Sequence, residues 1–436
     1  MHITYIGLGY VGLVHSVLLA SFGNDLIAYD KDKEKISLLK QGVATVEEPN
    51  LQTLLTEAKK YIRFTSNAHD AMCDSGIFFI AVDTPTDKNG ERNLSNFYEV
   101  LDRICEYVRK EFYVVIRSSV PVGTNKAVQK YLSERTKEKF HVISYPEFST
   151  EGHMVVDMLN TERIVVGCDD KECLDEVFES YNKLQAKKIP ILSVTPESAE
   201  LIDAASSALL ATKISFAAEL STFAEKVGAN IDEVIEGISL DSRIGGKYLK
   251  PGLGYGGPSL SENLKSLVYQ SDKVGETMHS IKASLSANDD LFDYLFRKIL
   301  TRFRSVQAKK IAVLGAAYKG GTEDIRDSIG IKIVKTLLDR GADVHLYDPL
   351  AEDNIRPVFS RHTHIKYFDY VTDALKGADF AIITTNEDEF AKLTPLDFKT
   401  NMRKPIVFDG RNIFKPEDMK EIEYYSIGRL DKIKRD

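Results

Sequence analysis

At 436 residues the chain is too long for a single hydrophobic core, and ordinary domain sizes predict two or three domains. Its composition, 43% hydrophobic and 28% charged, is typical of a globular protein. A formal net charge of −8 offers no basic stripe for a phosphate backbone, so we expect no nucleic-acid partner.

The apolar runs are short. Residues 77–82, one of the longest runs, have strand length, far below the ~20 residues that span a bilayer, so we expect no membrane segment. The N-terminus enters a structured motif without a basic segment ahead of an apolar one, which predicts a cytoplasmic protein without a signal peptide. Cys73, Cys105, Cys168 and Cys173 lack paired spacing, which predicts reduced thiols and no metal site.

Short apolar runs alternate with helix-length stretches through the first part of the chain. The runs read HITYIG, DLIAYD, GIFFIAV, YVVIRSS, FHVISYPEF and RIVVGC. Buried runs of this length, separated by helices, are typical of parallel strands. We therefore expect a doubly wound domain over residues 1–195.

A long helix follows. Thr195 is placed as its cap, Pro196 lies in the first turn and Gly228 lies just beyond the last turn, which predicts a helix over about residues 196–227. Apolar residues go most of the way round it, as expected for a helix with neighbours on both sides. We expect it to join two domains and also to form a homodimer interface, within a central helical domain over residues 196–303.

The strand pattern restarts after residue 303. KKIAVLGAAYKGG, ADVHLYDP, DFAIITTNEDEF and PIVFDGRN repeat the order of strand, glycine turn, helix and strand ending in an acid. This predicts a second Rossmann-like domain over residues 304–436. The expected fold class is therefore α/β, with two Rossmann-like doubly wound parallel-sheet domains joined by the long helix and a helical middle domain.

The first turn carries a dinucleotide fingerprint. Gly7, Gly9 and Gly12 follow a predicted strand in GxGxxG spacing, and Asp30 ends the next strand 18 residues after Gly12. In such a motif the glycines make the turn, admit the pyrophosphate and pack the helix on the strand, while the acid binds a ribose hydroxyl. An acid at position 30 would repel the extra phosphate of NADP, so we predict NAD.

Two other glycine-rich stretches leave alternatives open. Lys319 lies in the turn AAYKGG, where it either neutralises a phosphate or is a solvated loop lysine. The stretch GLGYGG, residues 252–257, is either a flexible turn or a backbone that a ligand approaches closely.

Taken together, these segments resemble the UDP-glucose/GDP-mannose dehydrogenase family over nearly the whole chain. The resemblance rests on GLGYVGL, AVDTPTDKNG, SSVPVGT, YPEFSTEG with LNTERIVVG, ELIDAASSALLATKISFAAE, DSRIGGKYLKPGLGYGG, AAYKGGTEDIRDS and FDGRN, in the family's order. It implies an NAD-dependent oxidoreductase of a sugar nucleotide, acting in polysaccharide biosynthesis.

The resemblance also implies site residues. Its cofactor contacts are Gly7, Gly9, Tyr10, Val11, Gly12, Asp30, Lys35, Thr84, Ser119, Glu151 and Arg326. Its sugar-nucleotide contacts are Glu147, Ser207, Tyr248, Gly252, Gly256, Lys319 and Arg243, the last reaching from a partner subunit. The alternatives are that Thr84 and Ser119 are strand-end hydrogen bonders and that Arg243 is an ordinary surface arginine, and the order of the family's motifs favours the functional interpretation.

The family's catalytic positions are altered. Its loop reads close to GGSCxPKD, which puts Ser259 at the cysteine that captures the aldehyde, Glu262 at a lysine and Asn263 at an aspartate. On the long helix, Asp203 takes the place of a lysine and Ser207 that of an asparagine. Positions 203, 262 and 263 thus carry a charge of −2 where the family carries +1.

These changes define the catalytic expectation and its alternatives. Ser259 would need an adjacent base to act as a nucleophile, so we do not expect the four-electron oxidation that passes through a thioester. We expect oxidation of one CH–OH group by a site containing Glu151, Ser259, Asp203 and Asn263, with Glu151, Asp203 or Glu262 as base. The alternative is a catalytically silent member that binds NAD, a sugar nucleotide or both. A third possibility is a cationic or amino-bearing substrate.

Overall fold

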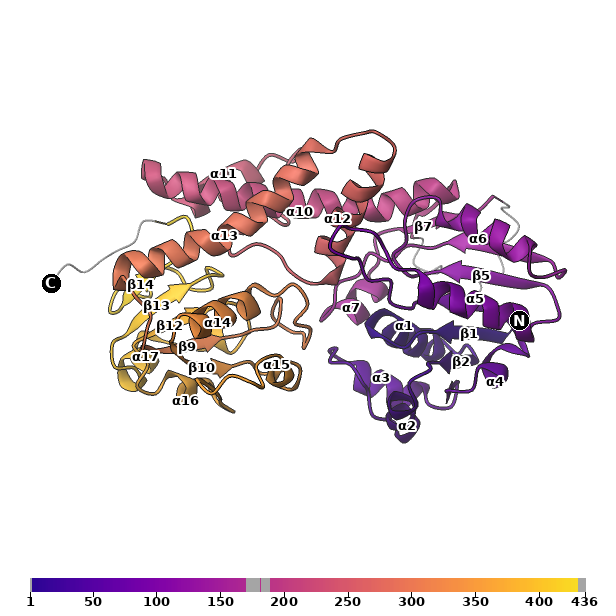
Figure 1. The fold of residues 1–436 in the computed structure, drawn as a ribbon, viewed down its shortest axis with the longest axis horizontal. Coiled ribbons are helices and arrows are strands. Elements are labelled where there is room, and N and C mark those ends of the chain that lie inside the picture. Colours follow the sequence, from indigo (N-terminus) through magenta and orange to yellow (C-terminus); the bar gives the residue numbers. More distant parts are fainter. Residues whose placement is uncertain (1, 170–180, 182–188, 430–436) are drawn as a thin grey trace. The chain divides into compact units, whose positions relative to one another are not determined.

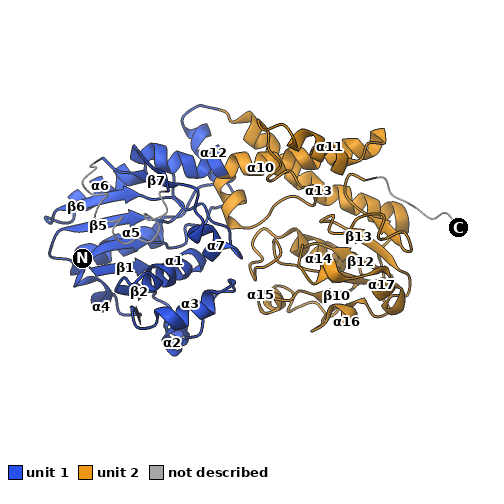
Figure 2. Cartoon of the chain, turned by 180° about the vertical axis from the view of Figure 1, so that it is seen from behind, with its two compact units in different colours: residues 1–206, 265–276 blue, residues 207–264, 277–436 orange. Residues whose placement is uncertain are grey.

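The protein is described here from a computed structural model, which covers residues 2–169, 181 and 189–429. The chain divides into two compact units (Figure 2), unit 1 comprising residues 1–206 and 265–276 and unit 2 comprising residues 207–264 and 277–436. Two of the three boundaries between the units, at residues 206/207 and 264/265, fall inside helices, so two helices belong partly to each unit. The predicted boundaries at residues 195 and 303 remain predictions.

Unit 1 contains a sheet with eight strands among its described residues (Figure 1). The strands are β1 (His2–Ile6), β2 (Leu26–Tyr29), β3 (Ile62–Thr65), β4 (Ser75–Ile80), β5 (Phe112–Ile116), β6 (Phe140–Ser144), β7 (Ile164–Gly167) and β8 (Ile191–Val194), in the order β3-β2-β1-β4-β5-β6-β7-β8. The first six follow the order of dinucleotide-binding folds. All neighbours are parallel except β6 and β7, which are antiparallel.

Helices cover both faces of this sheet. They are α1 (Tyr10–Ser21), α2 (Lys33–Gln41), α3 (Leu51–Ala58), α4 (Ala68–Met72), α5 (Ser95–Tyr107), α6 (Thr124–Ser133) and α7 (Met154–Leu159). Alternate strand residues turn to opposite faces, so Ile77 and Phe79 pack with α1, α2, α3 and α7, whereas Phe78 and Ile80 pack with α4, α5 and α6. Strands buried on both faces account for the continuous apolar runs in the sequence.

Unit 2 contains a six-stranded, fully parallel sheet among its described residues. Its strands are β9 (Lys310–Leu314), β10 (Asp343–Tyr347), β11 (Ile365–Tyr367), β12 (Phe380–Ile383), β13 (Ile406–Asp409) and β14 (Glu423–Tyr425), in the order β11-β10-β9-β12-β13-β14. This is the same topology as the first six strands of unit 1. Around it lie α14 (Ile329–Asp339), α15 (Glu352–Val358), α16 (Val371–Leu375), the 3-10 helix η1 (Phe390–Lys392) and α17 (Pro395–Asn401).

The middle of the chain is helical, as predicted. Its helices are α10 (Pro196–Val227), α11 (Ile231–Ser239), α12 (Pro258–Lys273) and α13 (His279–Phe303). The expected start of α10 is confirmed, because the Ser198 amide donates to Thr195 Oγ1 at 3.3 Å. Gly228 follows the last turn in the left-handed region, with φ +80°. The prediction of two parallel-sheet Rossmann-like domains and a helical middle is thus confirmed.

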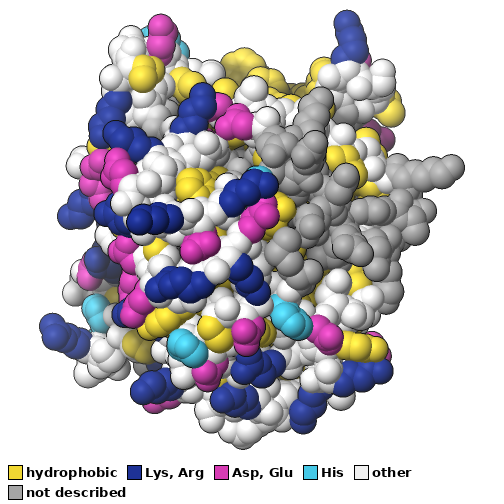
Figure 3. Space-filling model, turned by 90° about the vertical axis from the view of Figure 1, so that its right-hand side faces the viewer, with side chains coloured by type: hydrophobic (Ala, Val, Ile, Leu, Met, Phe, Trp, Pro, Cys, Tyr) yellow, Lys and Arg dark blue, Asp and Glu magenta, His cyan; other side chains and the backbone are white. Residues whose placement is uncertain are grey.

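By length and composition α10 is long and apolar enough to cross a membrane, which the short apolar runs did not indicate. The buried core helix of a globular protein meets the same criterion, and 39% of the tested window is buried. On the face shown in Figure 3, Lys and Arg side chains are interspersed with Asp and Glu. Cys73, Cys105 and Cys168 form no disulfide with one another, and Cys173 lies outside the described residues.

Candidate functional site

The three glycines of the turn after β1 differ in the atoms that an added Cβ would contact. A Cβ on Gly12 would lie 1.7 Å from the Gly7 carbonyl oxygen, so Gly12 lets α1 pack onto the turn. Gly7 has φ +88°, and its Cβ would lie 2.7 Å from the Ala81 carbonyl oxygen. At Gly9 a Cβ would meet nothing within 4 Å. Gly9 therefore faces open space at the N-terminus of α1, where backbone N–H groups favour an anion.

Asp30 lies beside this turn, directly after β2. One carboxylate oxygen, Oδ2, accepts the Leu8 amide at 2.9 Å and the Lys35 ammonium at 3.1 Å, and Oδ1 accepts the Asp32 amide at 3.0 Å. The structure thus brings together two of the predicted cofactor residues, Asp30 and Lys35, next to the fingerprint glycines. The positive charge of Lys35 offsets the negative charge of the Asp30 carboxylate.

The corresponding acid of unit 2, Asp348, differs. Its Oδ2 accepts the amides of Ala316 and Ala317 at 2.6 and 2.8 Å, and its Oδ1 accepts those of Leu350 and Ala351 at 3.1 and 2.8 Å. Asp348 is 4% exposed. The carboxylate is therefore engaged by its own backbone, so the second glycine turn lacks the acid that the first presents.

Tyr10, another predicted cofactor residue, connects three segments of unit 1. Its hydroxyl donates to Glu48 Oε2 at 2.6 Å and accepts the Gly152 amide at 2.6 Å. Glu48 Oε1 accepts the Val155 amide at the start of α7 at 3.0 Å. Burial, followed by the neighbouring Glu48, raises the pKa of Tyr10 well above its usual range, so the hydroxyl stays protonated. These bonds fix the backbone that carries Glu151.

Thr84, Ser119 and Asp203 form a polar group at the carboxyl ends of β4 and β5. Thr84 Oγ1 donates to the Ser119 carbonyl oxygen at 2.5 Å, and Arg92 Nη1 donates to the Thr84 carbonyl oxygen at 2.7 Å. Burial raises the pKa of Asp203 to about 6, against the opposing charge of Arg92 and a hydrogen bond with Ser119. Arg92, which the sequence patterns did not single out, partly offsets the acid at position 203.

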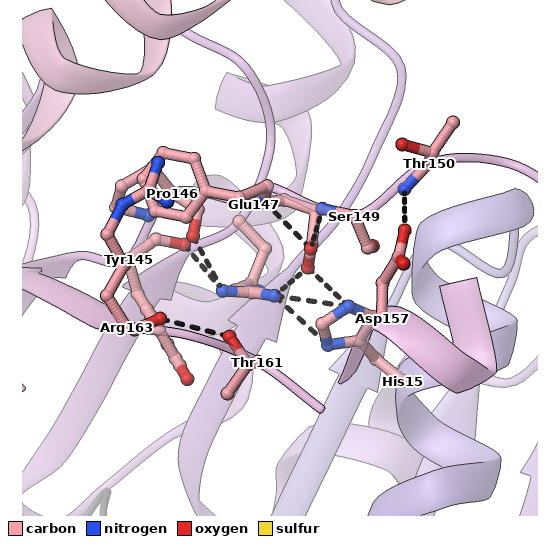
Figure 4. Close-up of polar contacts among 11 residues, drawn as sticks. His15, Tyr145, Pro146, Glu147, Ser149, Thr150, Asp157, Thr161 and Arg163 are labelled. Atoms are coloured by element: carbon pink, nitrogen blue, oxygen red, sulfur yellow. Dashed lines mark hydrogen bonds and ion pairs between the residues drawn. The ribbon is translucent and has the colours of Figure 1, made fainter. Parts of the chain in front are cut away.

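Glu147 is the centre of a buried charge cluster (Figure 4). Its Oε2 bonds both Arg117 and His15, while its Oε1 accepts the amides of Phe148 and Ser149 at 2.8 and 2.7 Å. Burial by itself would raise the pKa of Glu147, but the interactions of its carboxylate with His15 and Arg117 outweigh burial and hold the pKa well below its usual range. The carboxylate is therefore ionised and fixed.

Arg117 and His15 were missed by sequence reasoning. Arg117 Nη1 donates to the carbonyl oxygens of Tyr145 and Pro146 at 2.8 and 3.1 Å, and its guanidinium lies over the Tyr145 ring, 4.1 Å from the centroid. Burial lowers the pKa of His15, although Glu147 opposes the shift. A charged residue directly after the buried strand β5 was the one available signal for Arg117, and His15 inside an apolar helix gave none.

In unit 2 the stretch 252–257 is closely packed. A Cβ on Gly254 would lie 2.1 Å from Asn288 Oδ1, one on Gly256 would lie 2.4 Å from the Asp327 carbonyl oxygen, and one on Gly257 would lie 2.6 Å from the Tyr318 ring. At Gly252 the nearest atom would be the Gly410 carbonyl oxygen, 3.3 Å away. The glycines at 254, 256 and 257 are thus required by the protein's own packing, which neither sequence alternative included.

Hydrogen bonds hold the same stretch in place. Arg411 Nη1 donates to the Gly254 carbonyl oxygen at 2.7 Å, and Arg411 Nε donates to that of Thr384 at 2.6 Å. Asn288 pairs with the Tyr255 backbone, accepting its amide at 2.9 Å and donating to its carbonyl at 3.0 Å. Burial lowers the pKa of Arg411 to about 10, which leaves it a cation at neutral pH. FDGRN contains Arg411, but no role was assigned to that residue.

The altered catalytic positions lie at the start of α12. Ser259, the second residue of the helix, is exposed, and its hydroxyl makes no hydrogen bond within the described part of the chain. Asn263 is 4% exposed and donates to Ser207 Oγ at 3.0 Å, which joins α12 to α10. Ser261 Oγ donates to Asp327 Oδ2 at 2.5 Å. The structure therefore pairs two predicted site residues, Ser207 and Asn263.

The remaining predicted residues, except Val11, also lie in unit 2. Arg326 bonds Asp324, and its carbonyl oxygen accepts the Gly257 amide at 2.9 Å. The Arg243 side chain is 87% exposed and pairs with Asp241. Tyr248 is 41% exposed and has φ +66°, and Lys319 Nζ lies 5.9 Å from the Tyr318 ring centroid. Val11, which follows Tyr10 in α1, is half-buried in unit 1.

The open glycine turn, the adjacent acid and the strand order define unit 1 as a dinucleotide-binding α/β fold. Family models for the UDP-glucose/GDP-mannose dehydrogenase family match its NAD binding domain to residues 1–185, its central domain to 197–290 and its UDP binding domain to 312–416. The chain belongs to this family, and the predicted cofactor, NAD, is confirmed.

Relatives match almost from end to end. UDP-glucose 6-dehydrogenase of Rhizobium meliloti is 36% identical over 443 residues, covering 99% of this chain and 100% of the relative. UDP-glucose 6-dehydrogenase YwqF of Bacillus subtilis is 34% identical over 435 residues, covering 98% of each. A solved UDP-glucose dehydrogenase from Pyrobaculum islandicum superposes with a TM-score of 0.90 at 30% identity, covering 98% of each chain.

Proposed function

We propose that the protein is an NAD-dependent dehydrogenase of a sugar nucleotide that oxidises one CH–OH group of the sugar. Gly9 carries this proposal: it is the fingerprint glycine whose missing side chain faces open space, at a helix N-terminus beside an acid. A dinucleotide pyrophosphate fits such a place, because backbone amides of α1 are free to donate there and Asp30 can accept from a ribose hydroxyl. NAD supplies the hydride acceptor of the oxidation.

Two half-buried acids of unit 1, Glu147 and Asp203, suit different tasks. Glu147 is held ionised by Arg117 and His15, so it can accept a hydrogen bond from a sugar hydroxyl but is too weak a base to take its proton. Burial raises the pKa of Asp203 to about 6. A pKa close to the operating pH is the one that favours general-base catalysis. We assign proton removal from the alcohol to Asp203, with Glu151 as the other candidate.

The residue at position 259 determines whether a second oxidation can follow the first. A second oxidation needs a nucleophile that captures the aldehyde, and a hydroxyl is weak in that role unless a base removes its proton. The Ser259 hydroxyl has no such partner among the described residues. We therefore expect the reaction to end after transfer of one hydride and one proton, with an aldehyde or ketone as product.

The product ratio tests this proposal. Purified protein is incubated with NAD and with UDP- and GDP-sugars in turn, and NADH formed per sugar consumed is measured alongside the mass of the product. One NADH per sugar is expected, and Asp30→Ala should abolish it by weakening cofactor binding. Two NADH per sugar and a uronate product would refute the one-step reaction. Ser259→Cys is the matched variant, because it restores the thiol at the same position.

A catalytically silent protein is the second candidate. The observation that favours it lies in the sequence: acids stand at positions 203 and 262, which the family resemblance aligns with lysines, and an acid repels negative charge that develops on a substrate oxygen. Saturable binding of NADH and of UDP or GDP by calorimetry, with no NADH formed from any sugar nucleotide at any pH, would support this reading over the first.

The protein is also proposed to be a homodimer through α10. Leu209, Phe216 and Phe223 recur every seventh residue, which places them in one stripe of the helix, and they are 63%, 51% and 61% exposed. A second copy would cover this stripe, and it would bring the partner's surface near the exposed Arg243. The cytoplasmic location remains a prediction.

A further inference from the structure

The loop between β5 and α6 is held by side chains from outside it. Its Val122 amide donates to Gln270 Oε1 at 2.8 Å, and its Gly123 amide donates to Glu200 Oε2 at 2.6 Å. The Asn125 amide, in the first turn of α6, donates to Glu200 Oε1 at 2.8 Å. Glu200 belongs to α10 and Gln270 to α12, and both lie in unit 1.

Glu200 supplies the cap that α6 lacks. The N-cap residue of α6 is Gly123, which has φ +93° and no side chain to accept an amide. The Glu200 carboxylate takes this role from a different helix, is 4% exposed, and also accepts the Ser144 hydroxyl at 3.2 Å. A carboxylate at a helix N-terminus is favoured by both the unpaired amides and the helix dipole.

The loop held in this way leads to predicted site residues. Ser119 lies in it, and the Ser119 carbonyl oxygen accepts Thr84 Oγ1 at 2.5 Å. Asp203 lies one helical turn after Glu200 on α10 and bonds Ser119. The loop follows the carboxyl end of β5, and ligands of open α/β sheets bind at the carboxyl ends of the strands.

We propose that Glu200 and Gln270 are positioning residues of the NAD site, which hold the Ser119 loop in the conformation that binds the cofactor. Neither side chain is free to contact NAD, because each is engaged with the loop backbone. Their effect is to remove the cost of ordering the loop when NAD binds. The proposal rests on the proposed use of Ser119 as a cofactor contact.

Glu200→Gln tests the clamp with little change of shape. A glutamine keeps one acceptor oxygen but places an NH₂ donor opposite the Gly123 or Asn125 amide, so one hydrogen bond is lost and two donors meet. We expect the Kd for NADH, measured by fluorescence titration, to rise about tenfold, the effect of one such loss on binding. Hydrogen exchange of the Val122 and Gly123 amides should quicken in the cofactor-free protein.

Glu197→Gln is the matched control. Glu197 lies one turn before Glu200 and pairs with Lys126 of α6, so this variant removes the same charge and a contact with the same helix without touching the loop. Gln270→Leu removes the acceptor for Val122, and Gln270→Glu keeps it. We expect Gln270→Leu to weaken NADH binding and Gln270→Glu to keep the affinity of the wild type. The Kd for UDP should be unchanged in all four variants.

The possible results distinguish the positioning role of Glu200 and Gln270 from the proposed dehydrogenase function. If the wild type binds NADH and Glu200→Gln and Gln270→Leu bind it equally well, the positioning role is wrong while the dehydrogenase proposal stands. If exchange of the loop amides quickens without a change in the Kd for NADH, the clamp is structural only, which also overturns the inference. A wild type that binds no NADH would refute both.

Discussion

Two glycines three residues apart in the same turn should respond oppositely to the same substitution. Gly12→Ala places a Cβ 1.7 Å from the Gly7 carbonyl oxygen, half of an ordinary contact distance, and a backbone atom cannot move aside as a side chain can. Gly9→Ala meets nothing within 4 Å, and its φ of −70° and ψ of −162° suit alanine. One change should therefore damage the fold and the other only the cofactor site.

The magnitudes follow from these contacts. Forcing a methyl group into packed structure costs about 1–3 kcal/mol and more where backbone must shift, so we expect Gly12→Ala to lose about 3 kcal/mol of unfolding free energy. Gly9→Ala should change stability by less than about 1 kcal/mol, with the lower backbone entropy of the unfolded chain favouring the variant. The methyl group would occupy the approach of the pyrophosphate, so the Kd for NADH should rise about tenfold or more.

Urea unfolding followed by circular dichroism measures the first effect, and NADH fluorescence titration measures the second. The reasoning is refuted if Gly9→Ala binds NADH as tightly as the wild type, because the open space at Gly9 would then not be the cofactor's. It is equally refuted if Gly12→Ala unfolds at the same urea concentration as the wild type.

Three further predictions concern the charges and the long helix. Arg117→Met leaves the Glu147 carboxylate without its guanidinium partner and should lower the free energy of unfolding by about 3–5 kcal/mol at pH 7. This loss of stability should shrink towards pH 3, because the low pKa of Glu147 stabilises the native protein only where the unfolded carboxyl is ionised. A loss independent of pH would contradict this. Burial raises the pKa of Asp203 from 3.8 to about 6 in the folded protein, so its ionised form destabilises the fold. Asp203→Asn should therefore gain about 1–3 kcal/mol at pH 8 and less than about 1 kcal/mol at pH 4, where the unfolded carboxyl is only partly ionised. A loss of stability at pH 8 would show that the carboxylate is stabilising instead. Leu209→Glu with Phe216→Glu should yield a monomer by light scattering, whereas a wild type that is already monomeric would rule out the α10 dimer.

Most of the secondary structure was predictable, and the omissions share a cause. β3, β8, β11 and β14 were not anticipated, and they have only three or four residues each. β3, β8, β11 and β14 are also the edge strands of the two sheets. A strand with a single neighbour is partly exposed, as in the burial of β8 and β11, so its sequence lacks the continuous apolar run of a central strand.

The candidate site was predictable where its residues are close in sequence. The turn at Gly7, Gly9 and Gly12 and the acid at Asp30 follow from strand, turn and helix propensities within one βαβ unit. Their geometry is local, because a tight turn and a helix N-terminus impose the same requirements in any protein. For the same reason α10, from Thr195 to Gly228, was predicted at both ends.

Tertiary structure decided the rest. His15 and Arg117 are 102 residues apart and meet at Glu147, and Arg117 reaches Glu147 across 30 residues. The Glu200 carboxylate caps a helix 75 residues earlier in the chain. No local pattern encodes these contacts, because they depend on which strand ends and helix turns the packed sheet brings side by side. The sequence alone determined the βαβ units, the dinucleotide turn, the long helix and the family. Packing determined that Glu147 is held ionised, that the pKa of Asp203 is raised, and that the loop containing Ser119 is held by Glu200 and Gln270.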